Sequence, residues 1–66
     1  MKLVLNGSEQ ETPNLGTVAD LSAWLKLPAF GTAIELNGRI LRKADLQGTP
    51  LEEGDHLEIV RLVGGG

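Results

Sequence analysis

Two Asn-Gly pairs, at positions 6–7 and 37–38, constrain the fold of this chain more than any other feature of its sequence. Both residue types tolerate the positive φ angles of a two-residue type I′ turn, so each pair predicts a β-hairpin. The flanking segments are Leu3–Leu5 and Ser8–Thr12 for the first pair, and Ala33–Leu36 and Arg39–Arg42 for the second. The polar composition of Ser8–Thr12 further indicates an edge strand.

A helix is predicted between the two hairpins, in the segment TVADLSAWLKLP. Thr17 suits an N-cap, and Asp20, three residues further on, is placed to complete a capping box and to interact favourably with the helix dipole. Apolar residues recur at helical spacing on one face, with Trp24 beside it: Val18, Leu21 and Leu25. Pro28 disfavours helical geometry at the preceding residue, so we expect it to end a helix of about two and a half turns.

The rest of the chain leads from the second hairpin to a final strand. Its expected features are two inward-facing anchors, a turn and the strand itself: Leu46 and Leu51, Gly54-Asp55, and His56–Val63. One helix packed on a mixed four- to five-stranded sheet buries a single core, and a last strand after a long connection can lie beside the first. We therefore expect an α+β fold of the β-grasp (ubiquitin-like) type over residues 1–63, followed by a flexible tail over residues 64–66.

The final strand carries apolar residues on both of its faces. Leu57 and Ile59 share one face, whereas Val60 and Leu62 point to the other. Two interpretations remain open for the second pair. They lie at a bulge or in a continuation of the core, or they form a partner-docking patch on the sheet face away from the helix.

Composition and charge exclude several classes of function. The net charge of −3, with a single Trp, a single Phe and no Tyr, argues against a nucleic-acid partner, which needs a basic face or stacking aromatics. The basic cluster Arg39–Lys43 is expected to be a solvated strand edge. No cysteine is present for a disulfide, a thiolate metal site or a nucleophile, and no segment is long enough to span a bilayer. We expect a cytoplasmic protein with no membrane partner.

No catalytic constellation is evident in the sequence. His56 has no second histidine or cysteine with which to bind zinc, and the nearby acidic residues lack the spacing of a calcium loop: Glu52, Glu53 and Asp55. We therefore expect neither a metal site nor an enzyme. What remains is the glycine triplet at positions 64–66, which is either a linker remnant or a thin tether for the carboxylate of Gly66, because residues without Cβ fit where side chains would clash.

Several segments together resemble the ThiS family, the bacterial sulfur carriers of thiamine biosynthesis. The resemblance covers essentially the whole chain through LVLNG, TVADLSAWL, AIELNG with RIL, LEEGDHLEIV and VGGG. Gly65 and Gly66 match the terminal pair of the family, and Gly64 extends the tether. Arg42 and Leu46 stand where the family commonly has a proline and a large aromatic residue, which affects local surface detail.

The resemblance implies a β-grasp fold and a specific chemistry at Gly66. Its carboxylate would be adenylated by an E1-like partner of the ThiF type, which binds the ATP and magnesium. Sulfur from a cysteine desulfurase would then displace AMP and leave a thiocarboxylate. Thiazole synthase (ThiG type) would take this sulfur for the thiazole ring.

Three alternatives remain open at this stage. The small subunit of molybdopterin synthase also ends in Gly-Gly on a β-grasp body, although it is usually longer, and a ubiquitin-like protein modifier shares the same activation chemistry. A β-grasp interaction module with an incidental glycine tail belongs to a different functional class.

Overall fold

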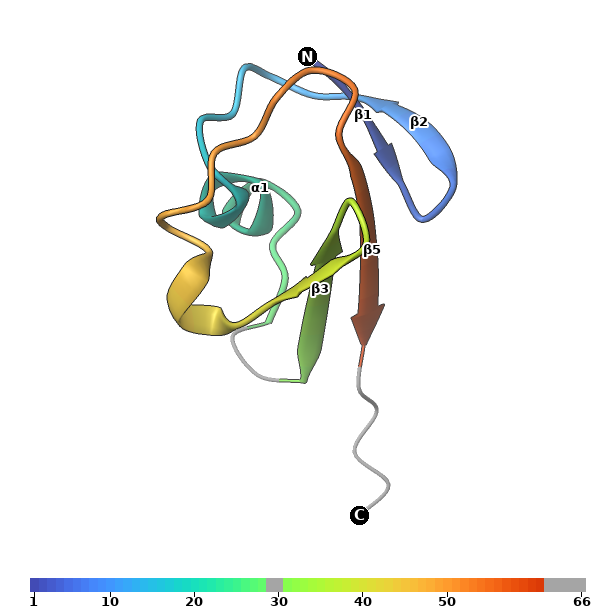
Figure 1. The fold of residues 1–66 in the computed structure, drawn as a ribbon. Helices are drawn as coiled ribbons and strands as arrows, with labels where there is room; N and C mark the ends of the chain where they lie inside the picture. Colours follow the sequence, from blue (N-terminus) through green and yellow to red (C-terminus); the bar gives the residue numbers. More distant parts are fainter. Residues whose placement is uncertain (29–30, 62–66) are drawn as a thin grey trace.

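The computed structural model describes residues 1–28 and 31–61 of the chain (Figure 1). The elements in chain order are β1 (Lys2–Leu5), β2 (Ser8–Glu11), α1 (Val18–Trp24), β3 (Thr32–Leu36), β4 (Arg39–Leu41), the 3-10 helix η1 (Lys43–Asp45) and β5 (His56–Arg61). The strands form one five-stranded sheet in the order β2-β1-β5-β3-β4. The last strand, β5, pairs with β1 in parallel on one side and with β3 in antiparallel fashion on the other. It therefore lies in the centre of the sheet beside the first strand, as predicted.

Both Asn-Gly pairs form the predicted turns. The φ angles are 50° and 83° at Asn6 and Gly7, and 49° and 87° at Asn37 and Gly38. Positive values at both central residues are those of a type I′ turn. The turns join β1 to β2 and β3 to β4 as antiparallel hairpins, and β2 and β4 are the outer strands of the sheet. The polar, exposed β2 is therefore an edge strand, as predicted.

The helix begins where the sequence predicts. Thr17 is the N-cap, with an extended backbone, and its hydroxyl oxygen accepts a hydrogen bond from the Asp20 N–H at 3.2 Å. The Asp20 carboxylate accepts one from the Thr17 N–H at 3.0 Å. These two bonds are the reciprocal contacts of a capping box, and they satisfy donors that have no partner within the helix.

The helix ends earlier than the sequence predicts, at Trp24 rather than directly before Pro28. Lys26 has a left-handed backbone with φ 56°. The N–H groups of Lys26 and Leu27 donate to carbonyl oxygens of the last helical turn at 3.1 and 3.0 Å, which is the pattern of a Schellman motif. The prediction that the proline ends the helix is therefore wrong. Glycine or asparagine usually marks this motif, whereas here a lysine adopts the left-handed conformation.

The core lies between α1 and one face of the sheet (Figure 1). Its buried apolar side chains, within the described residues, are Leu3, Val18, Leu21, Ile34, Leu41, Leu51 and Leu57. The predicted anchor Leu51 is buried, and Leu46 packs partly against the same cluster. Leu25 does so too, while the flanking Trp24 is 40% exposed. The apolar face predicted for the helix therefore forms part of the core.

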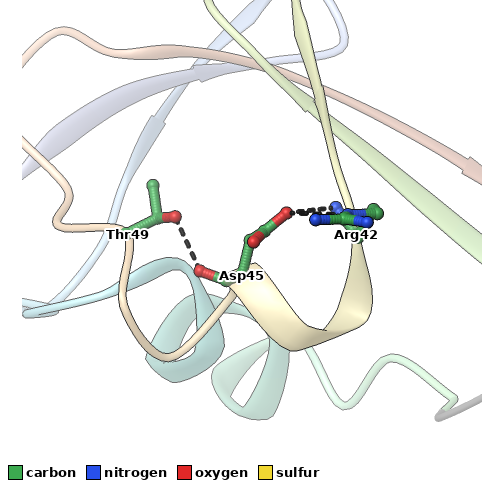
Figure 2. A network of polar contacts seen from close by, with 3 residues as sticks. All are labelled: Arg42, Asp45 and Thr49. Carbon is green, nitrogen blue, oxygen red and sulfur yellow. Dashed lines mark hydrogen bonds and ion pairs between the residues drawn. The ribbon is translucent and has the colours of Figure 1, made fainter.

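The connection between β4 and β5 closes over the N-terminal end of α1. Asp45 caps η1, since its Oδ2 accepts from the Arg42 N–H at 3.1 Å and lies 3.6 Å from Arg42 Nε (Figure 2). The Thr49 hydroxyl donates to the Asp45 carbonyl oxygen at 2.6 Å. The N–H of Val18, in the first turn of α1, donates to the Thr49 carbonyl oxygen at 2.9 Å. This connection thus supplies an acceptor for a helix-terminal N–H that the helix itself leaves without one.

Candidate functional site

Most of the predicted site lies outside the described residues. This applies to Gly64, Gly65 and Gly66, which would carry and present the reactive carboxylate, and to Leu62 of the docking patch. These assignments stay predictions. The described segment that leads to them is β5, which contains Val60.

The two faces of β5 differ as predicted. Leu57 is 1% exposed in the core, and Ile59 packs against the same cluster. Val60 is 52% exposed and lies opposite Ala33, on the face away from α1. The register between β3 and β5 is unbroken over all their paired residues, so Val60 does not lie at a bulge. Its role in docking a partner stays a prediction.

Two further features of this face were not predicted from the sequence. Ile40 of β4 is 71% exposed and lies opposite Glu35 of β3. Glu35 also lies opposite Glu58 of β5, so two carboxylates occupy neighbouring positions on the same side of the sheet. We call the surface formed by Val60, Ile40, Glu35 and Glu58 the open face. The predicted hairpin at Asn37-Gly38 already places Ile40 opposite Glu35, so the register of that turn could have identified this pair. The pairing of Glu35 with Glu58 joins strands that are distant in the sequence, and no local signal identifies it.

Two of the acidic residues before β5, Glu53 and Asp55, accept hydrogen bonds from backbone N–H groups. The Asp55 carboxylate accepts hydrogen bonds from the Glu52 N–H at 2.8 Å and from Asn37 Nδ2 at 3.1 Å. Glu53 Oε2 accepts one from the Lys2 N–H at 2.9 Å. Within residues 1–28 and 31–61, no group of three or more His, Cys, Asp or Glu side chains is placed to hold a metal ion. Two of these carboxylates therefore stabilise the turn that leads into β5.

A pocket of about 130 Å³ opens between α1 and the β3–β4 hairpin. Its described lining residues are Ser22, Pro28, Thr32, Ile34, Leu41, Lys43 and Leu46. Two of these described residues, Ser22 and Thr32, carry hydroxyl groups, and the Thr32 hydroxyl donates to the Pro28 carbonyl oxygen at 3.4 Å.

The described part of the chain contains no helix long and apolar enough to cross a membrane. The cytoplasmic location stays a prediction.

A comparison with protein-family models decides the relationship of this chain to known proteins. The model of the ThiS family matches residues 3–66. The chain belongs to the ThiS family. The matched range extends over both hairpins, the helix, the central strand and the glycines at positions 64–66. The family membership that the sequence motifs predicted is therefore confirmed.

Two solved structures confirm the ubiquitin-like β-grasp fold of this ThiS-family chain. A crystal structure of the thiamine biosynthesis protein ThiS from Geobacter metallireducens has a TM-score of 0.85 and 30% identity, with all of both chains covered. A solution NMR structure of a thiamine biosynthesis protein from the same organism has a TM-score of 0.82 and 30% identity. It covers all of this chain and 88% of the other.

A relative of this ThiS-family chain is considerably longer. A thiazole synthase from Paramagnetospirillum magneticum is 38% identical over 66 residues, which is all of this chain but 20% of that protein. The chain thus spans about a fifth of the length of this curated relative. The relative contains a segment similar to ThiS within a longer protein.

Proposed function

We propose that this chain is a sulfur carrier of thiamine biosynthesis whose C-terminal carboxylate is converted to a thiocarboxylate. The observation that carries the proposal is the ThiS-family match over residues 3–66, which includes the glycines at positions 64–66. In this proposal the chain is a protein co-substrate on which other enzymes act.

The chemistry follows from the weakness of a carboxylate as an electrophile. A Gly66 oxygen attacks the α-phosphate of ATP and displaces pyrophosphate, which turns that oxygen into part of a good leaving group. The terminal sulfur of a cysteine persulfide, supplied through a cysteine desulfurase, then attacks the acyl carbon and displaces AMP to form an acyl disulfide. A thiol reduces the S–S bond of this intermediate, which releases the thiocarboxylate and leaves the thiol oxidised as a disulfide. The E1-like enzyme of the ThiF type binds the ATP and magnesium, and this chain contributes the carboxylate on a tether without Cβ atoms.

Thiazole synthase is the proposed acceptor of the sulfur. The relative from Paramagnetospirillum magneticum bears that name and contains a segment that is 38% identical to this chain. A carrier-like segment within such a protein supports the proposal that the carrier works next to a thiazole synthase of the ThiG type.

The open face is the proposed docking surface for the adenylating enzyme. Val60 and Ile40 offer exposed apolar area, and Glu35 and Glu58 lie opposite each other across β3 and β5. Like charges directly opposite each other on neighbouring strands destabilise a sheet, so this pair is unfavourable in the protein without a partner. An enzyme surface with an Arg or Lys side chain surrounded by apolar groups would relieve this repulsion and cover the apolar side chains.

Val60→Asp is expected to weaken binding to the adenylating enzyme about tenfold or more. The substitution removes apolar contact area and adds a third carboxylate near the acidic pair. Isothermal titration calorimetry measures the change in Kd. Gln10→Asp on the exposed edge strand β2 is the matched control, since it adds the same charge away from the open face, and its Kd should stay near the wild-type value. Equal Kd values for Val60→Asp and the wild type would remove the open face from the docking surface.

The function is tested by incubating the chain with the adenylating enzyme, ATP and a sulfur donor. Intact-mass spectrometry should show a gain equal to the difference between sulfur and oxygen, and omission of ATP should abolish it. Transfer of this sulfur to product by thiazole synthase then identifies the pathway. An unchanged mass with an active enzyme contradicts the sulfur-carrier function, and transfer to a molybdopterin precursor alone would reassign the pathway.

A further inference from the structure

Asn6 and Asn37 bind the central strand in addition to forming turns. Asn6 Oδ1 accepts a hydrogen bond from the Ile59 N–H at 2.7 Å, and Asn6 Nδ2 donates to the Ile59 carbonyl oxygen at 3.3 Å. Asn37 Oδ1 accepts from the His56 N–H at 3.0 Å, and its Nδ2 donates to the Asp55 carboxylate at 3.1 Å. The two asparagines therefore hold opposite sides of β5, Asn37 near its beginning and Asn6 nearer its end.

The Asn6 side chain continues the ladder between β1 and β5 beyond the end of β1. The N–H groups of Val4 and Asn6 donate to the carbonyl oxygens of Asp55 and Leu57, each at 2.9 Å. Ile59 is the next residue of β5 whose backbone N–H and C=O point toward β1. At this level, however, β1 has already ended and the chain has turned into the hairpin. A side-chain carboxamide offers the same donor and acceptor as a peptide group. The carboxamide of Asn6 therefore replaces the missing β1 peptide group as the partner of Ile59.

Beyond Ile59, the described partner of β5 is β3 alone. Val60 pairs with Ala33, and Arg61 pairs with Thr32. Residues 62–66 follow Arg61 in the sequence and end in the carboxylate that the proposed function requires. Within the described residues, Asn6 therefore makes the last hydrogen bonds to the backbone on the β1 side of β5 before the reactive segment.

We propose that Asn6 is a positioning residue for sulfur loading, because it orders the end of β5 before the adenylating enzyme binds. This inference rests on the proposed function. A strand that is ordered in advance loses less conformational entropy when it docks, so the enzyme reaches half-maximal rate at a lower carrier concentration. Asn6 contacts Ile59 rather than the reacting atoms, so it acts on binding and leaves the chemical step unchanged.

Asn6→Gly tests this role, because glycine retains the positive φ angle of the turn and removes only the carboxamide. We expect the KM of the adenylating enzyme for the carrier to rise about five- to tenfold, since two hydrogen bonds that favour the ordered strand are lost. The kcat should stay within about twofold. Asn37→Gly is the matched control, with a φ angle of 49° against 50° and with two side-chain bonds at the other end of β5. Its KM should stay within about twofold of the wild-type value.

Hydrogen exchange of the isolated protein separates positioning from a general loss of stability. In Asn6→Gly, the Ile59 amide should exchange faster because it loses its acceptor, and the Val60 amide should also exchange faster because the end of the strand opens more often. Asn37→Gly should leave Val60 unchanged relative to residues elsewhere in the sheet.

Equal KM changes in the two variants, or unchanged Val60 exchange in Asn6→Gly, would overturn the proposal. Failure of the enzyme to convert the wild-type chain contradicts the proposed function and removes any role in loading. The exchange experiment still decides whether Asn6 orders the end of β5.

Discussion

Deletion of Gly66 is expected to lower the rate of thiocarboxylate formation at least about 100-fold while leaving the free energy of unfolding unchanged. The deletion withdraws the reactive carboxylate by one residue, or about 3.3–3.6 Å of extended chain. A misplacement of about 1 Å can already lower a rate about 100-fold when reacting groups must be aligned. Intact-mass spectrometry at successive times after addition of enzyme, ATP and sulfur donor measures the rate.

A second variant separates the position of the carboxylate from its chemistry. A full-length chain with a C-terminal amide at Gly66 retains the length of the tether but has no carboxylate oxygen to adenylate, so no conversion is expected. Urea unfolding of the deletion variant should follow the wild-type curve. Conversion of either variant at the wild-type rate would contradict the assignment of Gly66. A loss of cooperative unfolding in the deletion variant would show that the tail is structural.

Leu57→Ala is expected to lower the free energy of unfolding by about 2–5 kcal/mol. Leu57 is 1% exposed on the central strand, where it lies opposite Leu5 of β1 and Leu36 of β3. The loss combines the removed apolar contacts with the cavity that remains. Because a domain of this size has a total stability of only about 3–10 kcal/mol, a large part of it depends on this side chain. Urea unfolding followed by far-UV circular dichroism measures the change.

Val60→Ala on the same strand is the matched control for Leu57→Ala. Val60 is 52% exposed, so its truncation leaves no closed cavity, and the free energy of unfolding should fall by less than about 1 kcal/mol. Similar losses for the two variants would contradict the assignment of Leu57 to the core and of Val60 to the open face.

Much of the fold could be predicted because its signals are local. The turns at Asn6-Gly7 and Asn37-Gly38 depend on which residues tolerate positive φ angles. The capping box of Thr17 and Asp20 depends on side chains three residues apart. Helical spacing likewise identified the buried Val18 and Leu21. The end of the helix was predicted wrongly, because Lys26 adopts a conformation that its residue type rarely signals.

The candidate site could be predicted only in part. The exposed position of Val60 follows from the alternation of β5, and the interest in Gly66 follows from the motifs that resemble the ThiS family. Ile40 was missed although the predicted hairpin places it opposite Glu35, whereas the opposed Glu35 and Glu58 depend on the pairing of β3 with the distant β5.

Neighbouring residues are enough to specify the hairpin turns, the start of the helix and the faces of the strands. The bonds from the two turns to the central strand depend instead on how the sheet is assembled. Asn6 binds Ile59 across 53 positions of the chain, and Asn37 binds Asp55 across 18. Such bonds form only when the sheet brings distant segments together, so no local pattern encodes them. The asparagines of the two Asn-Gly pairs that predict the hairpins thus also bind β5 and the turn before it, which lead to residues 62–66.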